Sequence, residues 1–303
     1  MTRLVAFLAL PAALAAGADD QAAADRAAAD RLKELGAQVT VADGAVTKIV
    51  FRDCSKLGEA EYRLIGGLAR LRSLTLYGGC KTLDDKTIVH LGGLQALEEL
   101  GTDGMQLTDE GFRRLAGLRA LRTLSLFHPS LRLKGFTGAG LAHLAALPKL
   151  ERLTYAGTSA GDDADAAAAK LPHLTTLRTW HTYSTPAGVR HLAGMTKLKH
   201  LTLGQRLRRY DGGSNAPSLT DATVAELAAL ADLETLELDE ARLTFAGLQA
   251  LQRLGKLKKL TLKRIDIPAG DVEKLKAAMP GVTVTWTPLT DEERRKLDGY
   301  LAP

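Results

Sequence analysis

The feature that most constrains the fold of this chain is an apolar motif, L-x-x-L-x-L, that recurs along most of its 303 residues. Successive copies between residues 46 and 279 begin 25, 26, 24, 29, 24, 24, 35, 24 and 22 residues apart. A nearly fixed period of this length indicates a repeat architecture. Degenerate copies begin at Leu97, Leu150 and Leu174, and weaker ones at Val46 and Met279. The complete copies are Leu71-Leu74-Leu76, Leu121-Leu124-Leu126, Leu198-Leu201-Leu203, Leu233-Leu236-Leu238 and Leu257-Leu260-Leu262.

Several copies are followed by a second apolar set with helical spacing, for example Phe112, Leu115 and Leu118. Residues at i, i+3 and i+6 lie near one face of a helix. Several of these blocks begin with Thr or Asp, as at Thr108 and Thr220, whose side-chain oxygens accept the free amide hydrogens of a helix start. Each unit is therefore predicted to be a short strand, a loop and a helix. One unit cannot bury its leucine row alone, so stacked units must share a core.

The chain resembles the leucine-rich repeat family, and within it the ribonuclease-inhibitor-like, cysteine-containing subtype found in exported bacterial proteins. The resemblance covers residues 46–286 and is specific, because eight or more copies stay in phase with helical blocks. It implies an α/β leucine-rich repeat solenoid, with a curved parallel sheet on the concave face and helices on the convex face. It also implies a function in protein–protein interaction. The related role of substrate receptor in ubiquitin ligases is disfavoured by the leader described next and by the lack of an F-box-like segment.

The two ends of the chain depart from the repeat. Residues 1–18 combine Arg3, a short apolar stretch and small residues in the order of a secretory signal peptide; a buried N-terminal helix is the alternative. We therefore expect an exported protein, periplasmic or extracellular. Residues 19–45 are predicted to form an N-terminal cap of a helix and a hairpin around the Asp-Gly pair at 43–44. Residues 287–303 are predicted to form a C-terminal cap helix that helps to shield the last leucine row.

Composition narrows the function classes. The net charge of +5 is mild and is taken to be spread along the chain, which disfavours a basic arm for nucleic acid. No apolar run reaches 18 residues, so no transmembrane segment is expected. The sequence lacks G-x-S-x-G, phosphate-loop and G-x-G-x-x-G motifs, and repeats and caps use the whole chain. We expect a monomer that is not an enzyme and needs no cofactor.

Aromatic residues stand where the repeat turns side chains outward. Neighbouring strand residues point to opposite faces, so the residue after the last leucine faces the concave surface. Tyr77, Phe127 and Trp180 occupy that position, and Arg178 lies between the last two inward positions of its copy. Outward aromatics on an open face indicate a contact surface. Two alternatives remain: rings that only pack on one another, and rings that act as stacking platforms for a glycan.

Two repeats are longer than the others, because of insertions at 128–135 and 205–215 that project from the same rim. Inserted loops on one face of a repeat array are often its binding face, although such insertions also cost little free energy. Together with Phe127, Arg178 and Trp180 they are predicted to form a patch for an anionic or glycan-like group of an otherwise unknown, most simply protein, partner. Its further members are His200, Arg132, Lys134, Arg206, Arg208, Arg209 and Tyr210.

Cys54 and Cys80 occupy one ladder position in adjacent repeats. Adjacent strands lie about 4.8 Å apart, within the roughly 4.4–6.8 Å that a disulfide spans between Cα atoms. Buried thiols and an inter-repeat disulfide are both open, and thiols are favoured.

No metal site is predicted. Three histidines recur at one helix position of different repeats, which is an echo of the repeat, and an acidic run lacks the ligand spacing of a calcium loop, so it is interpreted as a charged helix start. These residues are His90, His143, His191, Asp162, Asp163 and Asp165.

Overall fold

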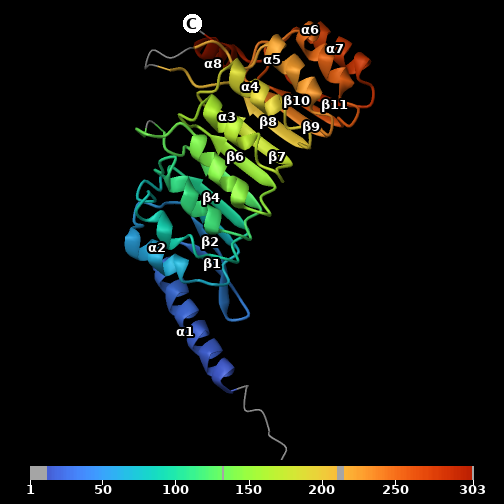
Figure 1. Cartoon of the computed structure of the whole chain (residues 1–303). Coiled ribbons are helices and arrows are strands. Elements are labelled where there is room, and N and C mark those ends of the chain that lie inside the picture. Colours follow the sequence, from blue (N-terminus) through green and yellow to red (C-terminus); the bar gives the residue numbers. More distant parts are fainter. Residues whose placement is uncertain (1–11, 132, 210–214, 302–303) are drawn as a thin grey trace, which may run out of the picture.

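The strands of the chain form one sheet in which each strand pairs with its neighbours in sequence (Figure 1). The computed structural model describes residues 12–131, 133–209 and 215–301, and this part contains eleven strands. Their bounds are β1 Gln38–Ala42, β2 Ala45–Phe51, β3 Ser73–Leu76, β4 Glu99–Asp103, β5 Thr123–Phe127, β6 Arg152–Ala156, β7 Thr176–Trp180, β8 His200–Gly204, β9 Thr235–Asp239, β10 Lys259–Lys263 and β11 Thr283–Trp286.

All strand pairs from β2 to β11 are parallel, and the leucine motifs lie in register. Leu74 is opposite Leu100, and Leu124 is opposite Leu153. β1 and β2 form the one antiparallel pair of this sheet, with a register shift between Thr40 and Val41. The predicted α/β leucine-rich repeat solenoid is therefore confirmed.

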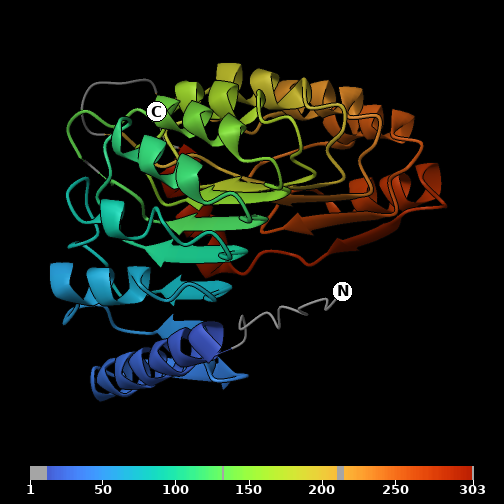
Figure 2. The same ribbon diagram turned by 60° about the horizontal axis from the view of Figure 1, so that its bottom comes forward.

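The segments between strands lie on the outer side of the curved sheet (Figure 2). The α-helices are α1 Ala12–Glu34, α2 Glu59–Gly66, α3 Asp162–Ala168, α4 Pro186–Ala193, α5 Asp221–Glu226, α6 Phe245–Leu248, α7 Ala269–Ala278 and α8 Asp291–Leu301. The 3-10 helices are η1 Ile88–His90, η2 Gly111–Gly117, η3 Ala139–Ala146, η4 Leu227–Ala229 and η5 Gln249–Arg253.

Several convex segments are 3-10 helices, whereas the other repeats have short α-helices at the same place. In η2 the buried residues Phe112 and Leu115 are three apart, and so are Leu141 and Leu144 in η3. The same spacing of three occurs between Val189 and Leu192 in α4 and between Val272 and Leu275 in α7, so it fits both kinds of helix and does not decide between them. Both apolar sets of each repeat enter a single core, in which Leu124, Leu153 and Leu236 are at most 1% exposed.

Helix α1 runs without interruption from Ala12 to Glu34, across residue 18; residues 1–11 of the predicted signal peptide lie outside the described residues. No helix in the described part of the chain combines the length and apolar character that crossing a membrane requires.

Helix α8 lies along the rim where strands end. Arg294 pairs with Asp266 after β10, Asp298 pairs with Arg242 after β9, and the Tyr300 ring reaches the loop after β7. The expectation placed this helix at the end of the solenoid, whereas these contacts draw it back over earlier repeats. In β11, the last strand of the sheet, the side chains of Val284 and Trp286 are half-buried.

Candidate interaction surface

Three aromatic rings form a continuous strip across the C-terminal ends of the strands. Tyr77, Phe127 and Trp180, here called the aromatic strip, come from alternate repeats and lean over the strands between them. The ring centroids of Tyr77 and Phe127 are 5.7 Å apart, and those of Phe127 and Trp180 are 6.2 Å apart. Gly204 in β8 leaves room for the Trp180 side chain, because an added Cβ at this position would lie 2.5 Å from the Cβ of Trp180.

The Tyr77 and Phe127 rings meet edge to face, the Phe127 and Trp180 rings are tilted, and all three keep part of their surface open. The planes of Tyr77 and Phe127 meet at 89°, and those of Phe127 and Trp180 at 55°. All three side chains are half-buried. The guanidinium carbon of Arg178 lies 5.5 Å from the Trp180 ring centroid, in a cation–π contact. Mutual packing thus accounts for part of each ring, and the remainder faces solvent.

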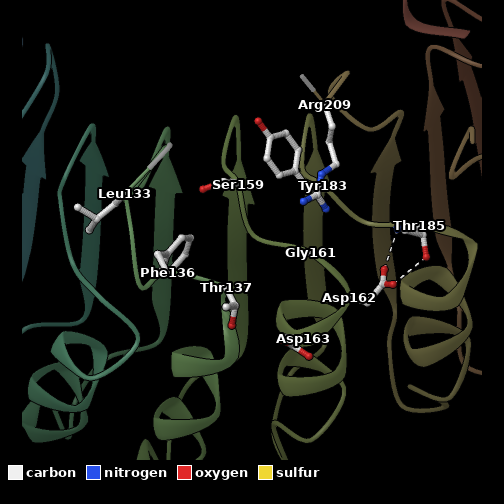
Figure 3. Close-up of a pocket in the computed structure, with 10 residues that line it drawn as sticks. All are labelled: Leu133, Phe136, Thr137, Ser159, Gly161, Asp162, Asp163, Tyr183, Thr185 and Arg209. Atoms are coloured by element: carbon white, nitrogen blue, oxygen red, sulfur yellow. Dashed lines mark hydrogen bonds between the residues drawn. The ribbon is translucent and has the colours of Figure 1, made fainter. Parts of the chain in front are cut away.

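The two inserted loops converge on one cavity at the rim. Its volume is about 860 Å³, and Figure 3 shows its lining side chains. Leu133 belongs to the first insertion, Phe136 directly follows it, and Arg209 belongs to the second insertion, although two other repeats lie between the loops. The Arg209 guanidinium lies 4.9 Å from the centroid of the Tyr183 ring. The other lining residues are Thr137, Ser159, Gly161, Asp162, Asp163 and Thr185.

The acidic run beside this cavity has structural partners. Asp162 accepts hydrogen bonds from the amide and hydroxyl of Thr185 (Figure 3). Asp165 is 1% exposed and accepts a hydrogen bond from the hydroxyl of Tyr155. Burial raises the pKa of Asp165 to about 7. Among the described residues no group of three or more His, Cys, Asp or Glu is arranged to hold a metal ion.

The basic side chains of the predicted patch differ in their exposure to solvent. Lys134, Arg178, His200 and Arg208 are exposed, and Arg209 is half-buried. Arg132 and Tyr210 lie outside the described residues.

Arg206 differs from the expected rim cation, because it is only 1% exposed. The side-chain oxygen of neighbouring Gln205 accepts hydrogen bonds from the amides of Arg206 and Ser218 and from the Ser218 hydroxyl. These bonds fold the two ends of the insertion together and place Arg206 inside.

Cys54 and Cys80 are free, buried thiols in the structure. The Cys80 thiol donates to the Leu76 carbonyl oxygen, with 3.0 Å between the sulfur and oxygen atoms. A hydrogen bond with Cys54, together with burial, raises the pKa of Cys80.

An ion-paired cluster after β7, β9 and β10 was not found by sequence reasoning. The Nε2 atom of His181 lies 2.6 Å from Oε2 of Glu240, and Arg264 lies 3.1 Å from the same carboxylate. Burial alone would raise the pKa of Glu240, but the His181 hydrogen bond and the nearby cations hold it below its ordinary value.

The backbone at all three residues of this cluster is left-handed. His181, Glu240 and Arg264 have φ values of 53°, 62° and 47°. The equivalent loop positions earlier in the chain hold Gly78, Gly104 and Gly157 and, with a φ of 47°, His128. Left-handed backbone at a residue other than glycine is uncommon and costs free energy. Charged residues at these positions therefore point to a specific role, which here includes seating the Tyr300 ring 5.4 Å from that of His181.

Comparison with known proteins finds solved structures of similar fold. No protein-family model and no curated protein matches the chain. Internalin C2 of Listeria monocytogenes is 21% identical over 76% of this chain and 84% of its own, with a TM-score of 0.48. A leucine-rich repeat protein of Leptospira interrogans is 17% identical over 74% and 68%, with a TM-score of 0.40. A second internalin of Listeria monocytogenes is 18% identical over 80% and 87%, with a TM-score of 0.33.

Proposed function

We propose that this chain is an exported, non-catalytic binding module that holds a protein partner on its concave face. The aromatic strip is the main contact and the rim of inserted loops is its border. The observation that carries the proposal is the half-exposed row of Tyr77, Phe127 and Trp180 on the outward side of the strands. Aromatic side chains are enriched in protein interfaces, because they bury large area with few rotatable bonds.

The ring geometry favours a protein over a linear glycan. Sugar units stack on ring faces, and a row of units needs faces that are roughly coplanar. The 89° and 55° angles within the aromatic strip present edges and faces in alternation. Apolar side chains of a protein pack against such a corrugated surface, since aromatic contacts tolerate edge-to-face geometry.

The test is affinity capture from cell envelope and culture medium with the chain from residue 19 onward. The test variant changes Phe127 and Trp180 to Ala, and the matched control changes Val41 and Val89, which are 44% and 42% exposed and lie away from the strip. A protein held by parent and control and lost by the test variant supports the proposal. Equal capture by all three, with unchanged far-ultraviolet circular dichroism, overturns the aromatic strip as the contact.

The glycan alternative is an outcome of the same experiment. A captured polysaccharide that survives high salt and is lost with Trp180→Ala would replace the protein partner, because stacking on a neutral ring is insensitive to screening.

A further inference from the structure

Positive charge is concentrated in two neighbouring repeats and is not spread along the chain as expected. Between residues 166 and 220 there are eight Lys and Arg residues and one acid, Asp211. This segment is therefore +7 in a chain whose total is +5, so the remainder is −2. Four of the seven histidines lie in the same segment. The excess of cations is a property of the sequence itself, since these two repeats contain a single acidic residue.

Elsewhere the repeats neutralise their own cations across the edge where strands begin. Arg72 of one repeat lies 3.5 Å from Glu98 of the next. Arg122 lies 2.9 Å from Glu151, and Lys258 lies 2.6 Å from Glu234, at the same position of the repeat. The alternation is interrupted at Thr175, which is uncharged. Lys199, the corresponding residue of the next repeat, stands beside Glu234, and that carboxylate already pairs with Lys258.

The cations near this break form no salt bridge among the described residues. Lys199 lies near Asp232 and Glu234, and its charge helps to lower the pKa of both carboxyl groups, but these acids are bonded to Lys256 and Lys258. Within the part of the chain that the structure describes, no acid lies within 4.0 Å of Lys170, Arg178, Lys197 or Lys199. All four side chains are exposed.

Arg178 and His200 line one hollow, which Glu237 shares, and Lys170 and Lys197 line another, where the convex segments of the two repeats end. These four residues, with Lys199 and the exposed His173, are here called the basic belt, and they belong to the adjacent repeats of β7 and β8. Clustered cations of this kind attract an anionic partner and speed its association.

The aromatic residues next to the basic belt favour one class of anionic partner over others. Arg178 contacts Trp180, so the belt runs into the aromatic strip and an occupant needs carboxylates and apolar groups together. Arginine presents a planar fork of donors that matches a carboxylate. Two strand spacings cover about 10 Å, close to the roughly 10–12 Å diameter of one helix. The tilted rings of the strip do not offer parallel faces on which successive bases could stack.

We propose that the basic belt recognises an acidic polypeptide segment of the protein partner. The inference rests on the proposed function, because a partner seated on the aromatic strip is what brings such a segment to Arg178. The belt then acts first in the encounter, by long-range attraction, and afterwards through direct pairing of carboxylates with Arg178, Lys197 and Lys199.

The test uses a fluorescent poly-L-glutamate of about 20 residues as the probe and measures anisotropy at low and at physiological ionic strength. The belt variant combines Lys170→Glu, Lys197→Glu and Lys199→Glu. The matched control combines Lys56→Glu, Lys81→Glu and Lys86→Glu, which are also exposed and change the net charge equally. We expect the belt variant to lose at least about tenfold in affinity, the control to change less than about twofold, and parent affinity to fall with added salt. If charge reversal disturbs the circular dichroism spectrum, Gln at the same three positions tests the same contacts.

Equal binding of the probe by parent and belt variant overturns the inference, and so does either of two further outcomes. Equal weakening by belt variant and control would reduce the effect to net charge. Stronger binding of duplex DNA or of phosphatidylglycerol vesicles, at equal probe charge, would assign the belt to nucleic acid or to a membrane surface.

The same variants separate this inference from the proposed function. Loss of the captured partner by Phe127→Ala/Trp180→Ala, with poly-glutamate binding equal in parent and belt variant, would sink the inference and leave the proposed function standing. Loss of poly-glutamate binding by the belt variant, with partner capture unaffected by the aromatic changes, would support the basic belt and overturn the aromatic strip as the contact.

Discussion

The carboxylate of Asp162 accepts two hydrogen bonds from Thr185 of the next repeat, one from its amide and one from its hydroxyl, each 2.7 Å long. It also accepts from the amide of Gly188 at 3.0 Å. An acid in one repeat thus caps the helix start in the following repeat. The same arrangement recurs at Asp85–Thr108, Asp109–Thr137 and Asp221–Thr244.

Asp162→Ala should lower the free energy of unfolding by about 1–3 kcal/mol, since it leaves helix-start amides without their acceptor. Chemical denaturation measures the change. Asp163→Ala is the matched control, because Asp163 is exposed in the same helical turn, and it should stay within about 0.5 kcal/mol of the parent. If both variants lost the same free energy of unfolding, the hydrogen bonds from Thr185 and Gly188 to Asp162 would not be what stabilises the helix start.

Gly140→Ala should destabilise the solenoid by about 1–3 kcal/mol or more, because overpacking forces the backbone to move. An added Cβ at this position would lie 2.3 Å from the backbone oxygen of Asp109 in the preceding repeat. Gly270→Ala in α7 is the control: nothing lies within 4 Å of its Cβ, so helix propensity should stabilise by about 0.5–1 kcal/mol. The midpoint of thermal denaturation should fall for Gly140→Ala and rise for Gly270→Ala.

Asp165 should make the protein less stable as pH rises toward 7 and above. Its pKa in the folded chain is about 7, raised from 3.8 chiefly by burial, so the unfolded chain holds the proton less tightly. The penalty is absent below about pH 4 and complete above about pH 7. Asp165→Asn keeps an acceptor for Tyr155 and should gain about 2–4 kcal/mol relative to the parent at pH 8, with the gain shrinking toward pH 5. Parallel stability–pH curves for the two proteins would contradict this.

Cys54 and Cys80 should titrate as two thiols with a disulfide-exchange reagent after unfolding and react slowly before it. Both are at most 1% exposed, and burial raises the pKa of Cys80, so little thiolate is available. Mass spectrometry of the intact chain before and after reduction is the direct check. A gain of two hydrogens on reduction would show that the pair is bonded.

The repeat made much of the fold predictable, because its information is local. Inward leucines such as Leu74 and Leu124 were identified from their spacing, and their pairing across strands followed from stacking. The spacing of three between Phe112 and Leu115 predicted a helical segment but not its 3-10 geometry, because the same spacing occurs in the α-helices α4 and α7.

The candidate surface was less predictable. The positions of Tyr77, Phe127 and Trp180 follow from strand alternation, but their contacts depend on how far each ring leans over the intervening strand. The rim cavity joins Phe136 to Arg209 across two intervening repeats, and no local pattern encodes that approach.

The sequence by itself determined the period, the inward and outward faces and the excess of cations between residues 166 and 220, since each is a property of neighbouring residues. Only the tertiary structure decided the burial of Arg206, the return of α8 along the rim and the pairing of His181 with Glu240. The last joins residues 59 positions apart across a repeat of unusual length. Such contacts depend on the curvature and stacking of the whole solenoid, which spacing along the chain does not record.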